Sequence, residues 1–217
     1  MQLIYVVRHG ETDANVKGQV NDRNVIIPLN ANGKSQATKT GKYFKKACSS
    51  CIIYSSPSVR AVQTATLIAK ELTVSKVIQD DRINEADHGI LSGSVPGDAI
   101  DKKFMKIINK LSKTDSVDRE LAYQKVEPTI NKNFKTESRE ATVARVKSFL
   151  KSLPKKKNII IVTHRGIIQG ILTALFNVIA QVSGDTTNGK NCSIMGIRKD
   201  ENKYQLLTTP NTIHLKN

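Results

Sequence analysis

The sequence predicts an α/β fold in which a mostly parallel central sheet is flanked by helices on both faces, with an inserted helical excursion. Three apolar runs rich in β-branched residues support this prediction: Leu3–Val7, CIIYSS from Cys51 and NIIIVTH from Asn158. Continuous apolar runs are typical of strands that are covered on both faces. Helical patterns lie between these runs, and strands that alternate with helices favour a parallel sheet.

Apolar residues recur at helical spacing in three segments between the predicted strands. These positions are Ala37, Gly41, Phe44 and Cys48; Val62, Ala65, Ala69 and Leu72; and Val143, Val146, Leu150 and Leu153. HRGIIQGILTALF is a fourth, mostly apolar helical segment. The segment CSIMGIRKDENKYQLLTT predicts two strands around a polar turn.

Residues 93 to about 135 interrupt this alternation. SGSVPGD is a turn cluster, and IDKKFMKIINKLSK has the pattern of a basic amphipathic helix. Residues 98–157 contain 16 Lys+Arg and 8 Asp+Glu, so this stretch supplies about half of the net charge. We expect a single domain over residues 1–217, with an inserted excursion on the substrate side at about 93–135.

The chain is strongly basic, with 34 Lys+Arg against 19 Asp+Glu and a formal net charge of +15. Such a balance favours anionic partners. Only 5% of residues are aromatic and Trp is absent, which disfavours nucleic acid as a partner, although the charge leaves it open. No apolar run reaches the length of a membrane span and no signal peptide is visible, so we expect a cytoplasmic protein without membrane contact.

Three cysteines are present, and two of them are close together in ACSSC. This spacing occurs in redox pairs and in half of a zinc site, but no second pair exists. We therefore interpret Cys48 and Cys51 as small buried hydrophobic residues, and leave a redox role open.

The ends of the predicted strands carry basic side chains. The strands are followed by Arg8, His9 and Gly10; by Ser55, Ser56 and Pro57, with Arg60 one turn into the next helix; and by His164, Arg165 and Gly166. Because the carboxyl ends of parallel strands share one edge of a sheet, these residues should meet there. Guanidinium groups and helix N-termini both bind phosphate. The sequence therefore predicts a phosphate pocket.

The opening motif RHGET resembles the signature of the histidine phosphatase superfamily, also called phosphoglycerate-mutase-like. Similar motifs follow in the family's order: PLNANGKSQATKTGKYF, YSSPSVRAVQTATLIA, INEADHGILSG, ESREATVARVKSFL, VTHRGII and, as a terminal strand, NTIHL. The resemblance covers nearly the whole chain. His214 lies in the last of these motifs, where we expect a structural role.

The resemblance implies a role for each matching residue. His9 corresponds to the nucleophile that becomes phosphohistidine, and Glu85 to the proton donor for the leaving oxygen. Arg8, Arg60 and His164 correspond to the residues that hold the phosphoryl oxygens. The chemistry is consistent, because a neutral imidazole attacks phosphorus and cations neutralise the charge on the equatorial oxygens. We therefore expect neither a metal nor a cofactor.

Other assignments are less direct. Asn15 matches a residue that commonly lines the phosphate. Arg165 departs from the family, in which many relatives carry a small or polar residue, and it either binds a second anionic group of the substrate or points away. Glu11, Asp87 and His88 are near enough in sequence to compete with Glu85 for the acid role, although we do not expect His88 to be catalytic.

The reaction class follows from what the excursion lacks. The resemblance implies that cofactor-dependent phosphoglycerate mutases carry a Trp-Arg-Arg run there, and residues 93–135 have neither Trp nor paired arginines. We expect a metal-independent phosphomonoesterase that acts on a small, multiply anionic substrate such as a sugar phosphate or bisphosphate. The alternatives are a phosphoglycerate mutase and a non-catalytic module that binds phosphate or polyanions. A homodimer is possible, because dimers are common among relatives.

Overall fold

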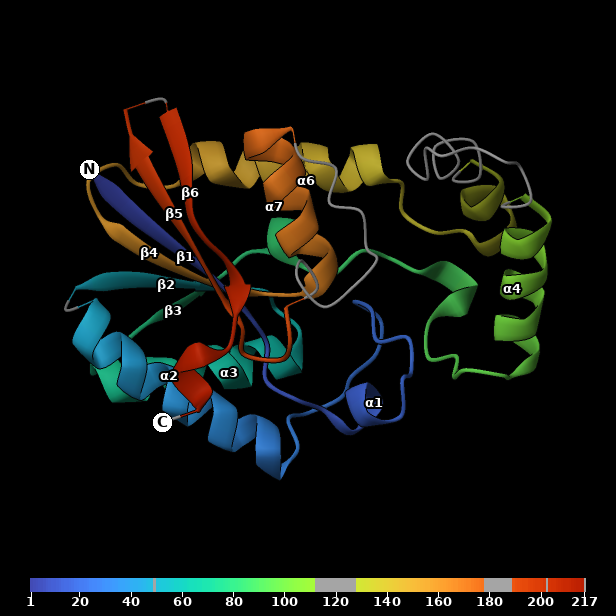
Figure 1. Cartoon of the computed structure of the whole chain (residues 1–217), viewed down its shortest axis with the longest axis horizontal. Helices are drawn as coiled ribbons and strands as arrows, with labels where there is room; N and C mark the ends of the chain where they lie inside the picture. The colour runs from blue at the N-terminus through green and yellow to red at the C-terminus, as the bar shows by residue number, and fades with distance from the viewer. Residues whose placement is uncertain (49, 112–127, 178–188, 202, 217) are drawn as a thin grey trace.

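The structure is a computed structural model that describes all residues except 49, 112–127, 178–188, 202 and 217. Its centre is a six-stranded sheet in the order β3-β2-β4-β1-β5-β6 (Figure 1). Four strands are parallel: β1 (Gln2–Arg8), β2 (Cys51–Ser55), β3 (Val77–Gln79) and β4 (Asn158–Thr163). Two more strands are antiparallel to their neighbours: β5 (Ile194–Asp200) and β6 (Lys203–Asn211). The predicted fold class is confirmed.

Helices cover both faces of the sheet (Figure 1). On one face lie α2 (Ala31–Ala47) and α3 (Val59–Leu72), and on the other lie α6 (Arg139–Ser152) and α7 (Arg165–Phe176). Successive residues of the central strands enter opposite cores: Ile159 and Ile161 pack with the α6–α7 layer, whereas Ile160 packs with α2 and α3. This two-sided burial explains the continuous apolar runs of β1 and β4.

The residues that follow β3 extend beyond the carboxyl ends of the strands. Two short 3₁₀ helices, η1 (Asp81–Ile83) and η2 (Gly89–Leu91), lead to α4 (Ala99–Leu111), which lies apart from the sheet in Figure 1. A small third cluster packs this region. Its members are Leu91, Ile130 and Phe134, with Val20 and Phe104 against them. Residues 112–127 of the predicted excursion lie outside the described residues, and its status as an insertion within one domain stays a prediction.

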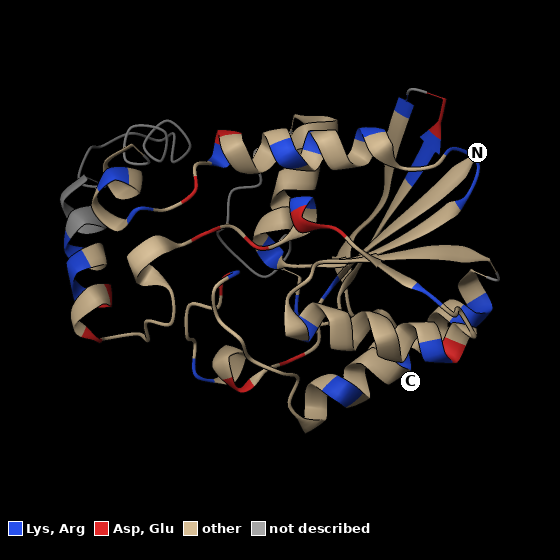
Figure 2. Cartoon of the chain, turned by 180° about the vertical axis from the view of Figure 1, so that it is seen from behind, with Lys and Arg blue, Asp and Glu red and all other residues tan. Residues whose placement is uncertain are grey.

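Basic residues occur on α2, α4 and α6, so positive charge is present on the sheet-covering helices as well as on the excursion (Figure 2). No helix among the described residues is long and apolar enough to cross a membrane.

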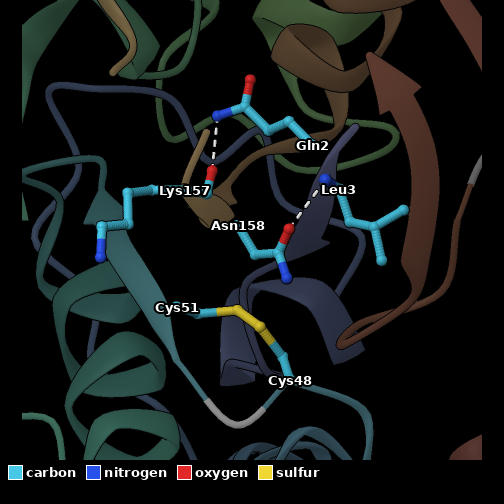
Figure 3. Close-up of a disulfide and its surroundings, with 6 residues drawn as sticks. All are labelled: Gln2, Leu3, Cys48, Cys51, Lys157 and Asn158. Carbon is cyan, nitrogen blue, oxygen red and sulfur yellow. Dashed lines mark hydrogen bonds between the residues drawn. A yellow bond between two sulfur atoms is a disulfide. The ribbon is translucent and has the colours of Figure 1, made fainter. Parts of the chain in front are cut away.

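Cys48 and Cys51 are buried as expected, but their interpretation as small hydrophobic residues alone is wrong. Both are buried in the α2–α3 core, but their sulfur atoms form a disulfide that joins the end of α2 to the start of β2 (Figure 3). Asn158 pairs with Cys51 in the sheet register, so the disulfide lies at the amino end of β4, opposite the end that carries His164. Disulfides persist in oxidising surroundings and are reduced by cellular thiols, so the state of this pair reports the redox compartment.

The C-terminal segment also differs from expectation. β6 ends at Asn211, and Ile213–Leu215 form a 3₁₀ helix, η3, in place of a terminal strand. His214 packs against the ring of Tyr43 and shares a hydrogen bond of 3.0 Å with Thr40 Oγ1. Both contacts attach the C-terminal segment to α2, which agrees with a structural role.

Candidate active site

The structure brings Arg8, His9, Arg60 and His164 together at the carboxyl end of the sheet. Arg8 is the last residue of β1 and pairs in register with Thr163, the last residue of β4. The next residues of these two strands are the histidines, whose ring centroids are 5.2 Å apart. Arg60 lies in the first turn of α3, after β2. Both imidazoles and Arg60 are buried.

His9 is held in the form that a nucleophile requires. Its Nδ1 atom lies 2.7 Å from the Gly10 carbonyl oxygen, which can only accept, so Nδ1 carries the proton and Nε2 keeps its lone pair. Burial, together with the charges of Arg60 and Arg8, lowers the pKa of His9 well below its ordinary value. The imidazole is therefore neutral at physiological pH.

His164 is held by contacts at both ring nitrogens. Its Nδ1 accepts a hydrogen bond from Arg60 Nη2 at 3.3 Å, and its Nε2 donates to Ser56 Oγ at 2.8 Å. Ser56 Oγ in turn donates a hydrogen bond to Asn84 Oδ1 at 3.0 Å. Burial, together with the charges of Arg60 and Arg8, lowers the pKa of His164 well below its ordinary value.

The two arginines use part of their donor capacity on main-chain carbonyls. Arg60 donates through Nη1 and Nη2 to the carbonyl oxygens of Asn21, Asp22 and Val25. Burial lowers its pKa to about 10, so it stays charged at neutral pH. Arg8 Nη1 donates to the Gly189 carbonyl oxygen at 2.9 Å. The Nε atoms of both arginines are buried and have no hydrogen-bond partner among the described residues, which suits donors to an anion.

Glu85 is the carboxylate at this cluster, and it is buried. Its charge acts on Arg8, Arg60 and Arg165. Its carboxylate accepts hydrogen bonds from the main-chain N–H groups of Ala86 and of Gly166, in the first turn of α7. A Cβ atom at position 166 would collide with Glu85 Oε1, so glycine there permits the approach of the carboxylate to α7.

The two carboxylates that compete with Glu85 for the acid role are engaged elsewhere. Glu11 Oε1 accepts from the side-chain amides of Asn30 and Asn32 at the start of α2. Asp87 Oδ1 accepts from the N–H of Gly89 and from Asn24 Nδ2. These contacts favour Glu85 over the other two carboxylates. His88, the third candidate, is held by its main-chain N–H, which donates to Asp22.

Asn15 and Arg165 lie at the margin of the cluster. Thr12 caps α1 (Asp13–Val16), and the amide oxygen of Asn15 completes this capping box by accepting from Thr12. The same oxygen also accepts from Asn191 Nδ2. Among the described residues, no hydrogen bond engages the amide nitrogen of Asn15, which can therefore donate to a ligand. Arg165, the exposed first residue of α7, lies within reach of the charges of Glu85 and Arg8.

Sequence reasoning missed the polar residues that support this cluster. They are Asp22, Ser56, Asn84 and Glu137. Asn84 Oδ1 accepts from Ser56 Oγ, Ser58 Oγ and the Glu85 N–H. It therefore joins the residues that follow β2 to the segment 82–87 around Glu85, which we call the acid loop. Two of the supporting residues could have been found from their position in the sequence, because Ser56 ends a predicted strand and Asn84 precedes Glu85. Among the described residues, no group of three or more His, Cys, Asp or Glu side chains could hold a metal ion.

A neutral imidazole with an available lone pair lies beside the buried guanidinium group of Arg60, the half-buried one of Arg8 and a carboxylate. These groups are suited to phosphoryl transfer or hydrolysis. The model of the family described as "Histidine phosphatase superfamily (branch 1)" matches residues 4–212. The chain belongs to this superfamily.

Curated relatives agree with this family. The chain is 30% identical over 182 residues to a protein of Hydrogenobacter thermophilus named "Putative phosphoserine phosphatase 2", covering 82% of this chain and 80% of that one. It is 42% identical over 93 residues to "Uncharacterized phosphatase PhoE" of Bacillus subtilis, a match that spans 43% of this chain and 47% of the relative.

Solved structures show the same fold. A phosphoglycerate mutase from Bacillus anthracis superposes with a TM-score of 0.81 at 20% identity, over 99% of this chain and 95% of that one. A phosphoserine phosphatase from Entamoeba histolytica, solved in complex with 3-phosphoglyceric acid, has a TM-score of 0.72 at 25% identity, over 99% and 100%.

The buried histidines predict how stability depends on pH. Folding lowers the pKa of His9 and of His164, so below about pH 6.5 the unfolded chain binds protons that the folded protein does not. The free energy of unfolding should therefore be highest above pH 6.5 and should fall as the pH falls, by up to about 1.4 kcal/mol per pH unit for each histidine.

Denaturant unfolding of wild type and His9→Asn between pH 8 and 5 measures this slope. The variant should lose the part of the slope that His9 contributes, and the difference at pH 8 corrects for altered packing. An identical slope in both proteins would contradict the buried, neutral state of His9.

Proposed function

We propose that this protein is a metal-independent phosphomonoesterase that acts through a phosphohistidine at His9 on a small, multiply anionic substrate. One observation carries the proposal: the Nε2 lone pair of a neutral, buried imidazole lies among cations whose Nε donors have no partner in the part of the chain that the structure describes. The name of the Hydrogenobacter relative supports a small phosphorylated substrate.

In the first step, Nε2 of His9 forms a bond to phosphorus as the ester P–O bond breaks. Arg8 and Arg60 stabilise the charge that spreads over the equatorial oxygens. His164 can donate to a phosphoryl oxygen when the substrate takes the place of Ser56 as the acceptor of its one N–H. The two guanidinium groups supply positive charge of the kind that a metal ion supplies in other phosphatases. The leaving oxygen departs as an alcohol because Glu85, which enters this step in its protonated form, gives it a proton.

In the second step, water attacks the phosphohistidine and the N–P bond breaks. The Glu85 carboxylate, left by the first step, accepts the proton of the attacking water. Inorganic phosphate leaves, and His9 returns to its neutral form. The same carboxyl group therefore serves as acid and then as base.

Replacing the nucleophile tests the proposal directly. His9→Ala should lower activity by more than about 10³-fold, because no other group can attack phosphorus at this position. Rapid-quench labelling with a ³²P-phosphomonoester should give an acid-labile, base-stable label in wild type and none in the variant. A ³²P label on the His9→Ala variant, or on a Ser or Asp of the wild type, would contradict the mechanism.

The products decide between phosphatase and mutase. Inorganic phosphate should accumulate from phosphomonoesters, and it should do so in EDTA within about twofold of the untreated rate, which is roughly 0.4 kcal/mol on the barrier. Conversion of 3-phosphoglycerate to 2-phosphoglycerate, with 2,3-bisphosphoglycerate present, should be negligible. Strong mutase flux with little phosphate would reverse the assignment, and binding without turnover would favour a non-catalytic module.

The role of Glu85 depends on the leaving group. An alkoxide needs a proton, whereas p-nitrophenolate is a stable anion. Glu85→Gln should therefore slow phosphohistidine formation by about 10²–10⁴-fold for an alkyl phosphate and far less for p-nitrophenyl phosphate, in single-turnover experiments. Glu11→Gln is the control, because the carboxylate of Glu11 is hydrogen-bonded to Asn30 and Asn32 at the start of α2. An equal loss for both substrates would mean that Glu85 does not donate a proton.

A further inference from the structure

Three residues joined by two ion pairs, Arg23, Glu137 and Arg145, form a triad beside the loop that carries Glu85. Glu137, just before α6, accepts from Arg23 Nη2 at 2.6 Å and from Arg145 Nε and Nη2 at 2.7 and 3.0 Å. The side chains of Glu137 and Arg145 are only 14% and 16% exposed, so this is a largely buried cluster and not a solvated surface pair.

The two arginines also hold the main chain of the acid loop. Arg23 Nε donates to the carbonyl oxygen of Glu85 itself at 3.0 Å. Arg145 Nη1 donates to the carbonyl oxygens of Arg82 and Asn84 at 2.8 and 2.7 Å. Each guanidinium group thus binds Glu137 with some of its N–H groups and the loop with others.

Glu137 completes the attachment on the other side of the loop. Its main-chain N–H donates to the Asp87 carbonyl oxygen at 2.7 Å, and its carboxylate accepts from the Asp87 N–H at 3.2 Å. Burial opposes ionisation of Glu137, but hydrogen bonds from Arg145 and the charges of both arginines hold its pKa below the ordinary value. The carboxylate is therefore charged, and it offsets the repulsion between two neighbouring cations.

Glu85 depends on its backbone for its position. Among the described residues, its carboxylate accepts hydrogen bonds only from the main-chain N–H groups of Ala86 and Gly166. The direction of the carboxylate is thus set by where the loop places its Cα atom.

We propose that Arg23, Glu137 and Arg145 are positioning residues that align the carboxyl group of Glu85 with the leaving oxygen. This inference rests on the proposed function of Glu85 as the general acid. The triad joins three distant segments: the loop that supplies Arg23, the acid loop and the start of α6. Glu137 follows the excursion in the chain, so the triad also connects the end of the excursion to Glu85.

Glu137→Gln tests the proposal, because it keeps the size of the side chain and removes the charge that holds both arginines. Phosphohistidine formation from glycerol phosphate should slow by about 10–100-fold, as expected for a misplaced group. Formation from p-nitrophenyl phosphate should change less than about threefold. Asp80→Asn is the matched control, since it breaks an Arg82–Asp80 pair of 2.7 Å next to the same loop but touches no bond to Glu85.

Further measurements separate positioning from a loss of structure. Affinity for inorganic phosphate should be unchanged in Glu137→Gln, and the double variant with Glu85→Gln should be no slower than Glu85→Gln alone. Where Glu137→Gln is misfolded, Arg23→Met leaves the Glu137–Arg145 pair in place and repeats the comparison. Equal losses for both substrates, or none, would overturn the proposal.

The outcome for Glu85→Gln distinguishes two failures. When that variant is selective for alkyl phosphates and Glu137→Gln is not, only the positioning role is wrong. When Glu85→Gln itself lacks selectivity, the proposed acid is wrong and the positioning role is overturned with it.

Discussion

Burial of positive charge at the carboxyl end of the sheet is the constraint on which the rest of the structure depends. Arg60 is among the largest fully buried side chains of the described residues, and it lies beside two imidazoles and Arg8. A buried charge without partners is strongly unfavourable. The protein meets this cost by directing main-chain carbonyls of residues 21–25 at the guanidinium group and by keeping both histidines neutral.

Asp22 links the two loops that surround this charge. Its carboxylate, which is buried, attracts Arg60 and accepts hydrogen bonds from the Asn24 N–H, the His88 N–H and Ser92 Oγ. The loop whose carbonyls bind Arg60 is thereby hydrogen-bonded to His88 and Ser92, which follow the acid loop. The same electrostatic requirement orders both the anion site and the segment that leads toward α4.

The two ends of the sheet serve different needs. At the amino end, the Cys48–Cys51 disulfide joins α2 to β2 (Figure 3). A hydrogen bond from the Leu3 N–H to Asn158 Oδ1 joins β1 to β4 at the same end. At the carboxyl end, polar side chains with buried, unpartnered donors remain. A two-sided apolar core holds the strands in place between them, so chemistry can be placed at one edge while packing supplies stability.

The sequence by itself determined the architecture and the convergence of Arg8, His9, Arg60 and His164, because apolar runs identify buried strands and parallel strands end at one edge. β3, with three residues, is too short for a pattern, and the η3 turn ended a predicted strand early. The spacing of Cys48 and Cys51 is visible in the sequence, but the geometry where α2 meets β2 decides that their sulfur atoms bond. The supports at Asp22, Asn84 and Glu137 were decided by tertiary structure, because their partners lie up to 114 residues away and in loops without periodicity. Only the folded path of the chain brings them within hydrogen-bond distance.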